Sequence, residues 1–543
     1  MKNLEIVFML VIGAGFIWQL PVALYIGVFL MGCHSTLFGP AKFAYLPQHL
    51  RETELTGGNG LVEMGTFVAI LLGTMLGGAL VAIPGMGPTY VAVTSVVIAV
   101  AGRIAAGFIP ASPPPAPELK INWNPVTETW ANLKIANKNR VVFLSMIGIS
   151  WLWFFGSIFL TSFTGFAKEV LSGNEQVVTL LLATFSVGIG VGSVLCEKMS
   201  GHRVEIGLVP FGAIGMTVFA IDLYFASRSG VVGPLIGAGE FISVGKNWRI
   251  MADLFLLAMF AGFYSVPLYS LMQSRTDKQF RARIIAANNI LNALFMIGSS
   301  VIAGALLGAK FTIPQIFLFT GLANAVVAFY IFMLVPEYFL RFIAWIASRF
   351  VYRFKVTGDQ HIPVEGAAIL TCNHVSFVDA VLLMAASPRP IRFVMDHRIF
   401  KVPVLGWMFR LAKAIPIASK SEDPVAYERA FADAQKVLQE GDLLAIFPEG
   451  GITKDGELQE FKGGIMKILE TAKSQGMEPP VIPMALTNLW GSYFSRVEKG
   501  NAMVRPFRRG VFSRVGLNVG APMAASAVQP AMLKERVQVL LKA

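Results

Sequence analysis

Ten long apolar stretches occupy the first 335 residues and limit what this chain can fold into. They lie at about 4–20, 22–38, 61–83, 89–109, 141–163, 176–196, 204–226, 251–272, 284–308 and 313–335. A helix needs about 20 apolar residues, with a lower limit of about 17, to cross a bilayer. We therefore predict an all-α polytopic membrane domain of about ten transmembrane helices over residues 1–335.

The composition agrees with an integral membrane protein. Of 543 residues, 55% are hydrophobic and 14% are charged, whereas ordinary soluble proteins carry about 25% charged residues. The net charge is +12, but the basic residues lie mostly beside apolar segments and in the C-terminal third, which favours anionic lipid over nucleic acid as a partner. Cys33, Cys196 and Cys372 are too widely spaced to indicate a disulfide framework or a zinc site.

Basic residues alternate between the loops that join the apolar stretches. Thirteen lie in every second loop: Lys42, Arg51, Arg103, Lys120, Lys134, Lys138, Arg140, Lys198, Arg203, Arg275, Lys278, Arg281 and Arg283. The intervening loops hold five: Lys168, Arg228, Lys246, Arg249 and Lys310. Because Lys and Arg are enriched in cytoplasmic loops, the first set is predicted to be cytoplasmic. Ten spans then place both termini and everything after residue 335 in the cytoplasm; the alternative is that the charges only solvate helix ends.

Two loops indicate a two-halved transporter. The loop at 110–140 begins with Pro113-Pro114-Pro115, a stiff start for a linker, and divides four spans from six. The loop at 192–203 carries Gly192, Glu197, Lys198, Gly201 and Arg203. This pattern resembles the Gly-x-x-x-Asp-Arg-x-Gly-Arg signature of the major facilitator superfamily. In that family the signature follows helices 2 and 8, so the resemblance implies that the spans correspond to helices 3–12, with two helices missing at the N-terminus.

Further stretches resemble the bacterial lysophospholipid transporters of this superfamily. They are Phe38-Gly39-Pro40-Ala41-Lys42, Thr56-Gly57-Gly58-Asn59-Gly60-Leu61-Val62-Glu63, Arg281-Ala282-Arg283 and Asn288-Asn289. Within or beside the spans lie four polar side chains: Glu63, Asp222, Asp253 and Asn292. A carboxylate inside a membrane is costly and is therefore a functional candidate. For Asp222 and Asp253, near span ends, we expect satisfied helix–helix hydrogen bonds instead.

The pattern changes after residue 335. Aromatic residues alternate with basic ones over 336–355, which predicts an interfacial amphipathic linker or an extension of the last span. From 356 to 543 we predict a cytoplasmic α/β domain. Short apolar runs at 367–371, 391–395, 443–447 and 481–486 indicate buried strands, and 427–439 indicates a helix.

Two short motifs follow predicted strands. They are Asn373-His374-Val375-Ser376-Phe377-Val378-Asp379 and Phe447-Pro448-Glu449-Gly450. A histidine can take the proton of a hydroxyl that attacks an acyl thioester, and a carboxylate fixes its tautomer. We predict His374 as the base and Asp379 as its partner. Direct attack by the acceptor hydroxyl is simpler than a covalent acyl-enzyme.

Both motifs resemble those of the glycerophospholipid acyltransferase family, over about 350–525. The resemblance implies acceptor binding by Glu449 and Gly450, although Glu449 has the alternative role of ordering the loop. Many members continue with Thr-Arg, where the arginine faces the acceptor phosphate, whereas this chain has Gly451-Ile452-Thr453-Lys454. The predicted substrate-binding residues are Asn373, Glu449, Gly450, Lys454 and Lys462. The run Arg505–Arg514 is expected to be a solvated or lipid-facing patch.

These observations predict a fusion protein of a bacterial inner membrane. A facilitator-like domain would deliver a lysophospholipid of the 2-acylglycerophosphoethanolamine type, and a cytoplasmic acyltransferase domain would acylate its free hydroxyl. The acyl donor would be an acyl-carrier-protein or coenzyme A thioester, preformed elsewhere, with no other cofactor and no metal. Two alternatives stay open: a 1-acylglycerol-3-phosphate acyltransferase whose membrane domain is only an anchor, and a transporter with an inactive acyltransferase-like domain.

Overall fold

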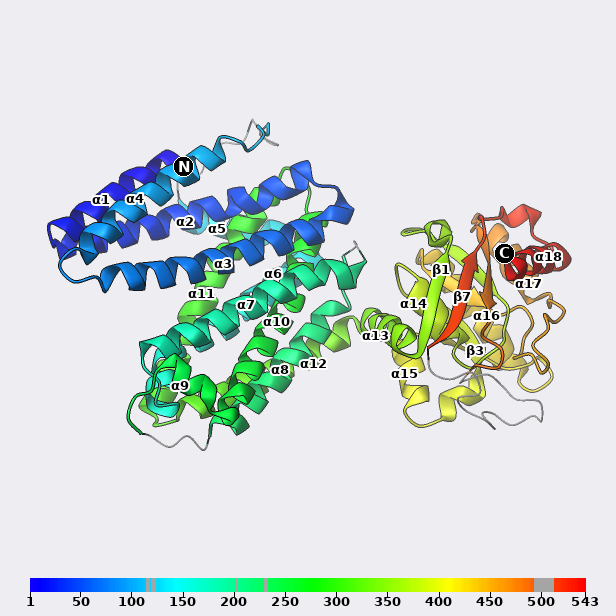
Figure 1. Ribbon diagram of the computed structural model, residues 1–543. Coiled ribbons are helices and arrows are strands. Elements are labelled where there is room, and N and C mark those ends of the chain that lie inside the picture. The colour runs from blue at the N-terminus through cyan, green and yellow to red at the C-terminus, as the bar shows by residue number, and fades with distance from the viewer. Residues whose placement is uncertain (114–117, 119–123, 202–203, 229–232, 493–511) are drawn as a thin grey trace. The chain divides into compact units, whose positions relative to one another are not determined.

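The computed structural model describes all residues except 114–117, 119–123, 202–203, 229–232 and 493–511. The chain divides into two compact units, Met1–Phe332 and Met333–Ala543. The first unit is helical and the second combines helices with a sheet (Figure 1). Some residues that carry sequence-based expectations lie outside the described residues: Pro114, Pro115, Lys120, Arg203, Arg505, Arg508 and Arg509.

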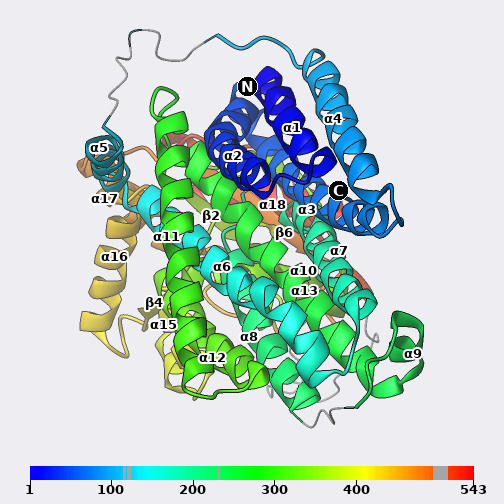
Figure 2. The same cartoon turned by 90° about the vertical axis from the view of Figure 1, so that its left-hand side faces the viewer.

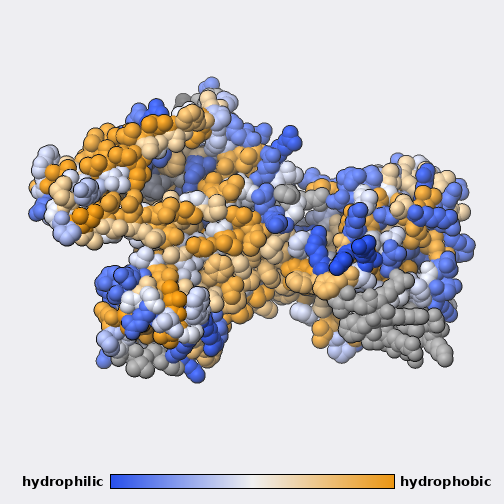
Figure 3. Space-filling model, in the orientation of Figure 1, coloured by the Kyte–Doolittle hydropathy of each residue, from blue (hydrophilic) through white to orange (hydrophobic). Residues whose placement is uncertain are grey.

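The helical unit has nine helices, within the described ranges, that are long and apolar enough to cross a membrane: α2, α3, α4, α6, α7, α8, α10, α11 and α12. The helices of this unit are α1 (Lys2–Ile17), α2 (Pro21–His49), α3 (Leu55–Val81), α4 (Gly87–Ala106), α5 (Pro125–Asn137), α6 (Arg140–Gly165), α7 (Glu175–Ser200), α8 (Leu208–Ser227), α9 (Ala238–Ser243), α10 (Gly245–Ser274), α11 (Arg281–Gly308) and α12 (Ile313–Leu334). On its visible face, this unit presents a broadly hydrophobic surface (Figure 3). The prediction of a helical membrane domain is confirmed.

The first of the ten predicted apolar stretches forms the shortest of the corresponding helices. Helix α1 ends at Ile17 after 16 residues, a length of about 24 Å against the roughly 30 Å of a bilayer core. A turn follows in which Gln19 has a φ of 51°, and Pro21 begins α2. Helix α1 packs against α2 and α4 (Figure 2). The predicted orientation of the later loops does not depend on α1, because the alternation of basic and less basic loops starts with the loop after α2.

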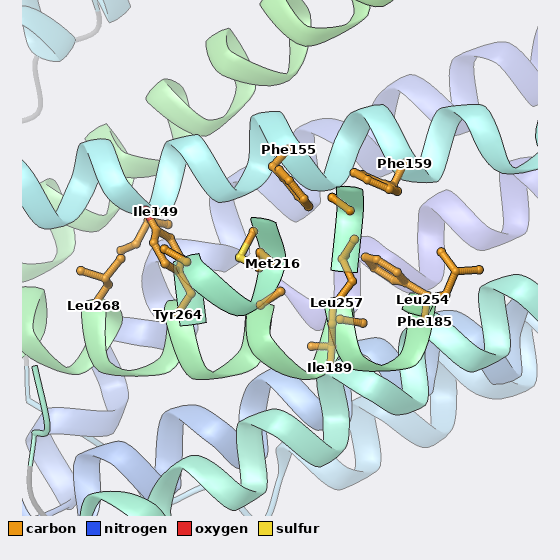
Figure 4. Packing of buried hydrophobic residues seen from close by; sticks show 14 of the residues in the cluster. Ile149, Phe155, Phe159, Phe185, Ile189, Met216, Leu254, Leu257, Tyr264 and Leu268 are labelled. Atoms are coloured by element: carbon orange, nitrogen blue, oxygen red, sulfur yellow. The ribbon is translucent and has the colours of Figure 1, made fainter. Parts of the chain in front are cut away.

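Helix α10 lies at the centre of the helical unit, where it packs against α7 and α8. Glycines make this approach possible: a Cβ on Gly192 of α7 would overlap the Met259 carbonyl, and one on Gly262 of α10 would lie 2.6 Å from the Ser193 nitrogen. Small residues at helix interfaces are typical of membrane bundles. Large side chains fill the remaining core, including Phe155 and Phe159 of α6 and Leu257 and Tyr264 of α10 (Figure 4).

The second unit contains a mixed sheet in the order β1-β7-β6-β2-β5-β3-β4 among its described residues. The strands are β1 (Tyr352–Thr357), β2 (Ala368–Cys372), β3 (Ile391–Asp396), β4 (Ile415–Ile417), β5 (Leu443–Ile446), β6 (Val481–Thr487) and β7 (Ser513–Val519). The paired strands are parallel except β6 and β7. The helices are α13 (Pro336–Val351), α14 (Asp379–Ala386), α15 (Leu405–Leu411), α16 (Pro424–Gln439), α17 (Gly464–Ser474) and α18 (Pro530–Lys542). The predicted α/β domain is confirmed.

Two hydrophobic clusters occupy the faces of this sheet, one containing α14 residues and the other residues of α16, α17 and α18. Every residue of β2 is buried, as expected for a parallel strand covered on both faces. Strands β2 and β5 are parallel neighbours, with Thr371 opposite Ile446. Their carboxyl ends therefore meet at one edge of the sheet, and the segments that carry the two motifs leave from that edge.

Helix α13, within the predicted linker 336–355, packs on its own α/β unit. It contacts α14 and β1, and the Arg341 Nη1 donates to the Ser387 carbonyl at 2.7 Å. Glu337 is buried and lies 3.1 Å from the Arg392 Nη1 and 2.7 Å from the Lys413 Nζ. The helix is amphipathic, as predicted, but its polar residues Glu337 and Arg341 face the protein. Its contact with a membrane stays a prediction.

Candidate active site

His374 and Asp379 lie side by side beyond the end of β2. The His374 Nδ1 and the Asp379 Oδ2 are 2.7 Å apart. The Asp379 side chain has no exposed surface, whereas 20% of the His374 side chain is exposed. Because an ionised carboxylate only accepts hydrogen bonds, Nδ1 carries the proton and Nε2 is the free base. The sequence-predicted pair is thus brought together in the geometry of an oriented general base.

The local chain path explains how five residues of separation produce this contact. Asp379 is the first residue of α14, and its Oδ2 also accepts hydrogen bonds from the backbone amides of Val375 at 2.7 Å and Ser376 at 3.0 Å. A carboxylate at the start of a helix that accepts hydrogen bonds from the preceding backbone amides stabilises the tight turn before the helix. Burial raises the pKa of the Asp379 carboxyl, and the three donors oppose that effect.

Phe447 covers one face of the His374 ring. The two ring centroids are 4.2 Å apart and the planes differ by 14°. Phe447 is the first residue after β5, so the stack joins the two motifs directly. The sequence motif contained Phe447, but no role was predicted for it, because stacking depends on the pairing of β2 with β5.

Glu449 is a buried carboxylate that holds two loops together. Its Oε1 accepts from the His374 backbone amide at 2.7 Å, and its Oε2 accepts from the Gln459 backbone amide at 2.9 Å. Burial raises the pKa of Glu449, and these amides oppose that effect. The geometry therefore supports the loop-ordering alternative, while acceptor binding by Glu449 stays a prediction.

The segment after Gly450 is a tight loop organised by Thr453. The Thr453 nitrogen donates to the His374 carbonyl at 2.9 Å. Its buried hydroxyl lies 2.9 Å from the Asp455 Oδ1 and 2.9 Å from the Glu457 carbonyl. Lys454, predicted to bind substrate, is exposed beside this anchor. The unusual Gly451–Lys454 continuation thus connects to the histidine loop through the backbone.

Gly450 and Lys462 lie against each other. Gly450 has a φ of 71°, a conformation that favours glycine, and a Cβ there would lie 2.5 Å from the Lys462 Nζ. The Lys462 backbone nitrogen donates to the Pro448 carbonyl at 2.8 Å. The exposed ammonium of Lys462 is therefore held beside the Pro448-Glu449-Gly450 turn. That placement suits the predicted contact with an acceptor phosphate.

Asn373 has a different environment from that expected of a substrate-binding residue. It is buried, its Nδ2 donates to the Leu486 carbonyl at 3.1 Å, and its Oδ1 accepts from the Leu486 nitrogen at 2.8 Å. This pair ties the start of the histidine loop to β6. Cys372 is also buried, and burial raises the pKa of its thiol, which disfavours a thiolate nucleophile.

Asp222, Asn292 and Glu63 have identifiable partners. The buried Asp253 Oδ2 has none among the described residues, so the satisfied hydrogen bond expected for Asp253 is not found at that oxygen. The Asp222 carboxylate binds the Arg249 guanidinium through two contacts of 3.1 and 2.5 Å, as expected for a satisfied helix–helix bond. Asn292 and Ser150 are 2.8 Å apart. Both Glu63 oxygens accept from the Ser265 hydroxyl, at 2.8 and 2.9 Å.

Family comparisons match each unit separately. The Major Facilitator Superfamily model matches residues 5–298, and the Acyltransferase model matches residues 353–487. A lysophospholipid transporter of Klebsiella pneumoniae is 28% identical over 284 residues, covering 50% of this chain and 65% of the relative. The chloroplastic 1-acyl-sn-glycerol-3-phosphate acyltransferase LPAT1 of Arabidopsis thaliana is 28% identical over 118 residues, covering 22% of this chain and 32% of the relative. The chain thus spans less than two thirds of either protein.

Two solved structures align with parts of the chain. The 1-acyl-sn-glycerophosphate acyltransferase of Thermotoga maritima aligns over 38% of this chain and 78% of its own, with 21% identity and a TM-score of 0.30. The fucose:proton symporter of Escherichia coli aligns over 61% of this chain and 83% of its own, with 13% identity and a TM-score of 0.43.

The fold and the site define a multi-pass membrane protein joined to an acyltransferase domain. The helical part resembles lysophospholipid transporters, and the α/β part resembles 1-acylglycerol-3-phosphate acyltransferases. The chain belongs to the Major Facilitator Superfamily and carries a C-terminal Acyltransferase-family domain.

Proposed function

We propose that this protein transfers a fatty acyl group from a thioester to the free hydroxyl of a lysophospholipid, of the 2-acylglycerophosphoethanolamine type. The observation that carries the proposal is the 2.7 Å contact between the His374 Nδ1 and the buried Asp379 Oδ2. That contact leaves Nε2 on a partly exposed ring, and no hydrogen bond within the described residues occupies it. A reacting hydroxyl can therefore approach Nε2.

The reaction follows from this geometry. The His374 Nε2 takes the proton of the lysophospholipid hydroxyl as the oxygen attacks the thioester carbonyl. The carbon–sulfur bond of the resulting tetrahedral intermediate breaks, and the sulfur leaves with the proton returned by His374. Asp379 holds the ring and stabilises the imidazolium between these steps. The donor is an acyl-carrier-protein or coenzyme A thioester.

Acceptor recognition is assigned to the lysines beside the turn. Lys462 is placed against Gly450, and Lys454 follows the Thr453 anchor. An ammonium at either position can pair with the phosphate of the acceptor as a point charge. These lysines take the place of the arginine that follows Pro-Glu-Gly in many family members.

The membrane domain supplies the acceptor in this proposal. Its similarity to a lysophospholipid transporter over 284 residues supports movement of lysophospholipid to the cytoplasmic leaflet of a bacterial inner membrane, where the acyltransferase domain lies. Joining the two units on one chain raises the effective concentration of the delivered lipid at the second site.

The proposal is tested by acyl transfer in membranes that contain the full-length protein. Labelled lysophosphatidylethanolamine is supplied with acyl-carrier-protein or coenzyme A thioesters. His374→Ala is expected to lower the rate by about 10²–10⁴-fold, the usual contribution of a general base. An unchanged rate in His374→Ala contradicts the mechanism.

His397→Ala is the matched control for that experiment. His397 also lies beside carboxylates of the same unit, but at 3.7 Å from Asp396 and 3.6 Å from Glu422, beyond hydrogen-bond distance. We expect this variant to keep the wild-type rate.

A second candidate function is acylation of 1-acylglycerol-3-phosphate with the membrane domain as an anchor only. The names of the plant relatives favour it, including a Brassica napus protein that is 31% identical over 136 residues. The two candidates differ in acceptor and in transport. Faster acylation of lysophosphatidic acid, combined with no lysophospholipid uptake into vesicles by His374→Ala protein, would favour the second candidate.

A further inference from the structure

Two opposite charges lie on the neighbouring helices α2 and α3, near the ends that the segment 50–54 joins. Lys42 is seven residues before the end of α2 at His49, and Glu63 is eight residues after the start of α3 at Leu55. At about 1.5 Å per residue, they lie roughly 10 and 12 Å from those helix ends. Ionisable side chains beside apolar spans are candidates for a functional role.

Each of the two side chains has a hydroxyl partner on another helix. The Lys42 Nζ donates to the Thr66 Oγ1 at 3.3 Å, and Thr66 lies three residues after Glu63, on the same face of α3. Glu63 accepts from the Ser265 hydroxyl of α10 through both oxygens. Lys42 and Glu63 both retain some exposed surface.

Lys42 and Glu63 act on each other electrostatically without forming a contact pair. Each is within range of the other's charge, yet the ion pairs found within 4 Å among the described residues do not include the two together. A direct ion pair between Lys42 and Glu63 would neutralise both charges most effectively, because the attraction between two charges weakens with distance. The arrangement leaves one cation and one anion available to a ligand that carries both signs.

The framework around this pair is rigid. The amides of Asn59 and Gln273 exchange hydrogen bonds of 2.7 and 3.0 Å between α3 and α10, and Gln273 also donates to the Phe43 carbonyl of α2 at 3.2 Å. The Phe43 and Tyr269 rings stack with centroids 4.8 Å apart. These contacts join the three helices that carry Lys42, Glu63 and Ser265, so the spacing of the charges is set before a ligand arrives.

We infer that Lys42 and Glu63 form the head-group site of the membrane domain, for a zwitterionic lysophospholipid. Lys42 binds the phosphate, and Glu63 binds the ammonium of the head group. The inference rests on the proposed function and deepens it, because it assigns the selection of an amine-bearing head group to two residues of the helical unit.

Uptake of two lysolipids into vesicles tests the assignment. Full-length protein with His374→Ala, which blocks acylation, is reconstituted and offered lysophosphatidylethanolamine or lysophosphatidylglycerol, which shares the phosphate but lacks the ammonium. Glu63→Gln is expected to lower uptake of the first relative to the second by about tenfold, the value of a charge-assisted bond. Lys42→Met is expected to lower uptake of both.

Conservative variants and a control separate recognition from folding. Glu63→Asp and Lys42→Arg keep the charges and should keep most of the wild-type preference. Glu175→Gln removes a carboxylate whose side chain is 79% exposed at the start of α7, and it should behave as wild type. Preserved preference in Glu63→Gln, or an equal loss of both lysolipids, overturns the head-group site while leaving transport in place. If the parent protein takes up neither lysolipid, the proposed transport fails, and this site with it.

Discussion

At the scale of single residues, one carboxylate oxygen organises the site. The Asp379 Oδ2 receives the His374 ring and two backbone amides, so it fixes the loop and the tautomer of the base together. Those three donors offset part of the cost of burying this group, whose pKa burial still raises and whose Oδ1 has no partner among the described residues. A base that is oriented before substrate arrives needs no rearrangement during the reaction.

Asp379→Asn is expected to reduce kcat by about 10³–10⁴-fold, because an amide cannot hold the histidine in the same tautomer. The KM for the acceptor should change little, since Asp379 is buried away from it. Steady-state acyl transfer at saturating donor measures both quantities. A loss smaller than tenfold would show that the dyad is not the catalytic unit.

Glu449→Gln distinguishes loop ordering from acceptor binding. An amide offers one acceptor oxygen, so one of the two backbone amides that now bind Glu449 would be left facing an NH₂ group. We expect faster hydrogen exchange in the segments around His374 and Gln459, together with a 10- to 100-fold lower rate, consistent with an unsatisfied buried donor. A raised KM with unchanged exchange would instead assign Glu449 to the acceptor.

At the scale of elements, the sequence predicted the central strands and missed the edge. The apolar runs at 391–395, 443–447 and 481–486 appear as β3, β5 and β6, because buried parallel strands are continuous apolar runs. Strand β7 alternates buried and partly exposed residues, and it pairs with β1, which lies more than 150 residues earlier. No local pattern encodes such a pairing, nor the stack of Phe447 on His374 that depends on strand order.

The docking of α13 also could not be predicted from the local sequence pattern. Its amphipathic pattern was visible in the sequence, but the pattern does not say whether lipid or protein covers a face. Glu337 shows that protein covers its face of α13, because its carboxylate lies between Arg392 and Lys413. Burial alone would raise the pKa of Glu337, but the Lys413 hydrogen bond and the Arg392 charge hold that pKa below its usual range.

The docking of α13 should therefore weaken in acid. A carboxyl with a lowered folded-state pKa stabilises the fold above its unfolded pKa of about 4.3, and that stability is lost as the pH falls through the folded value. Glu337→Gln should destabilise the docked helix by about 1–3 kcal/mol at neutral pH and flatten this acid dependence. Hydrogen exchange of α13 peptides, corrected for intrinsic rates, measures both effects.

Glu428→Gln is the control for α13 docking, since Glu428 is 60% exposed and pairs with Lys467. It should leave α13 exchange unchanged. If α13 exchange depends on acid equally in wild type and Glu337→Gln, Glu337 does not hold the helix in its docked position.

At the scale of the whole molecule, hydropathy and loop charge predicted a membrane unit followed by an α/β unit, and this organisation is confirmed. The short length of α1 was not predictable from the sequence. The apolar run that Pro21 follows does not reveal the turn at Gln19. The family match over residues 5–298 begins inside α1.

The cytoplasmic position of the acyltransferase domain is a prediction with a direct readout. Cys33 is exposed, while Cys196 and Cys372 are buried, so Cys33→Ser provides a background with low thiol reactivity. Lys420→Cys then adds one exposed thiol on the α/β unit. A membrane-impermeant maleimide should label it in inverted vesicles and not in intact spheroplasts. Labelling in spheroplasts would reverse the orientation.

We propose that one chain delivers a lysophospholipid and acylates it, and an assay with two separate compartments tests both steps together. Sealed vesicles hold the acyl donor on the side of the α/β unit, and labelled lysophosphatidylethanolamine is added on the opposite side. We predict labelled diacyl phospholipid with wild type, and uptake of unreacted lysolipid with His374→Ala. Diacyl product at the wild-type rate from His374→Ala would contradict the account, as would wild-type protein that acylates lysolipid only when donor and acceptor share one compartment.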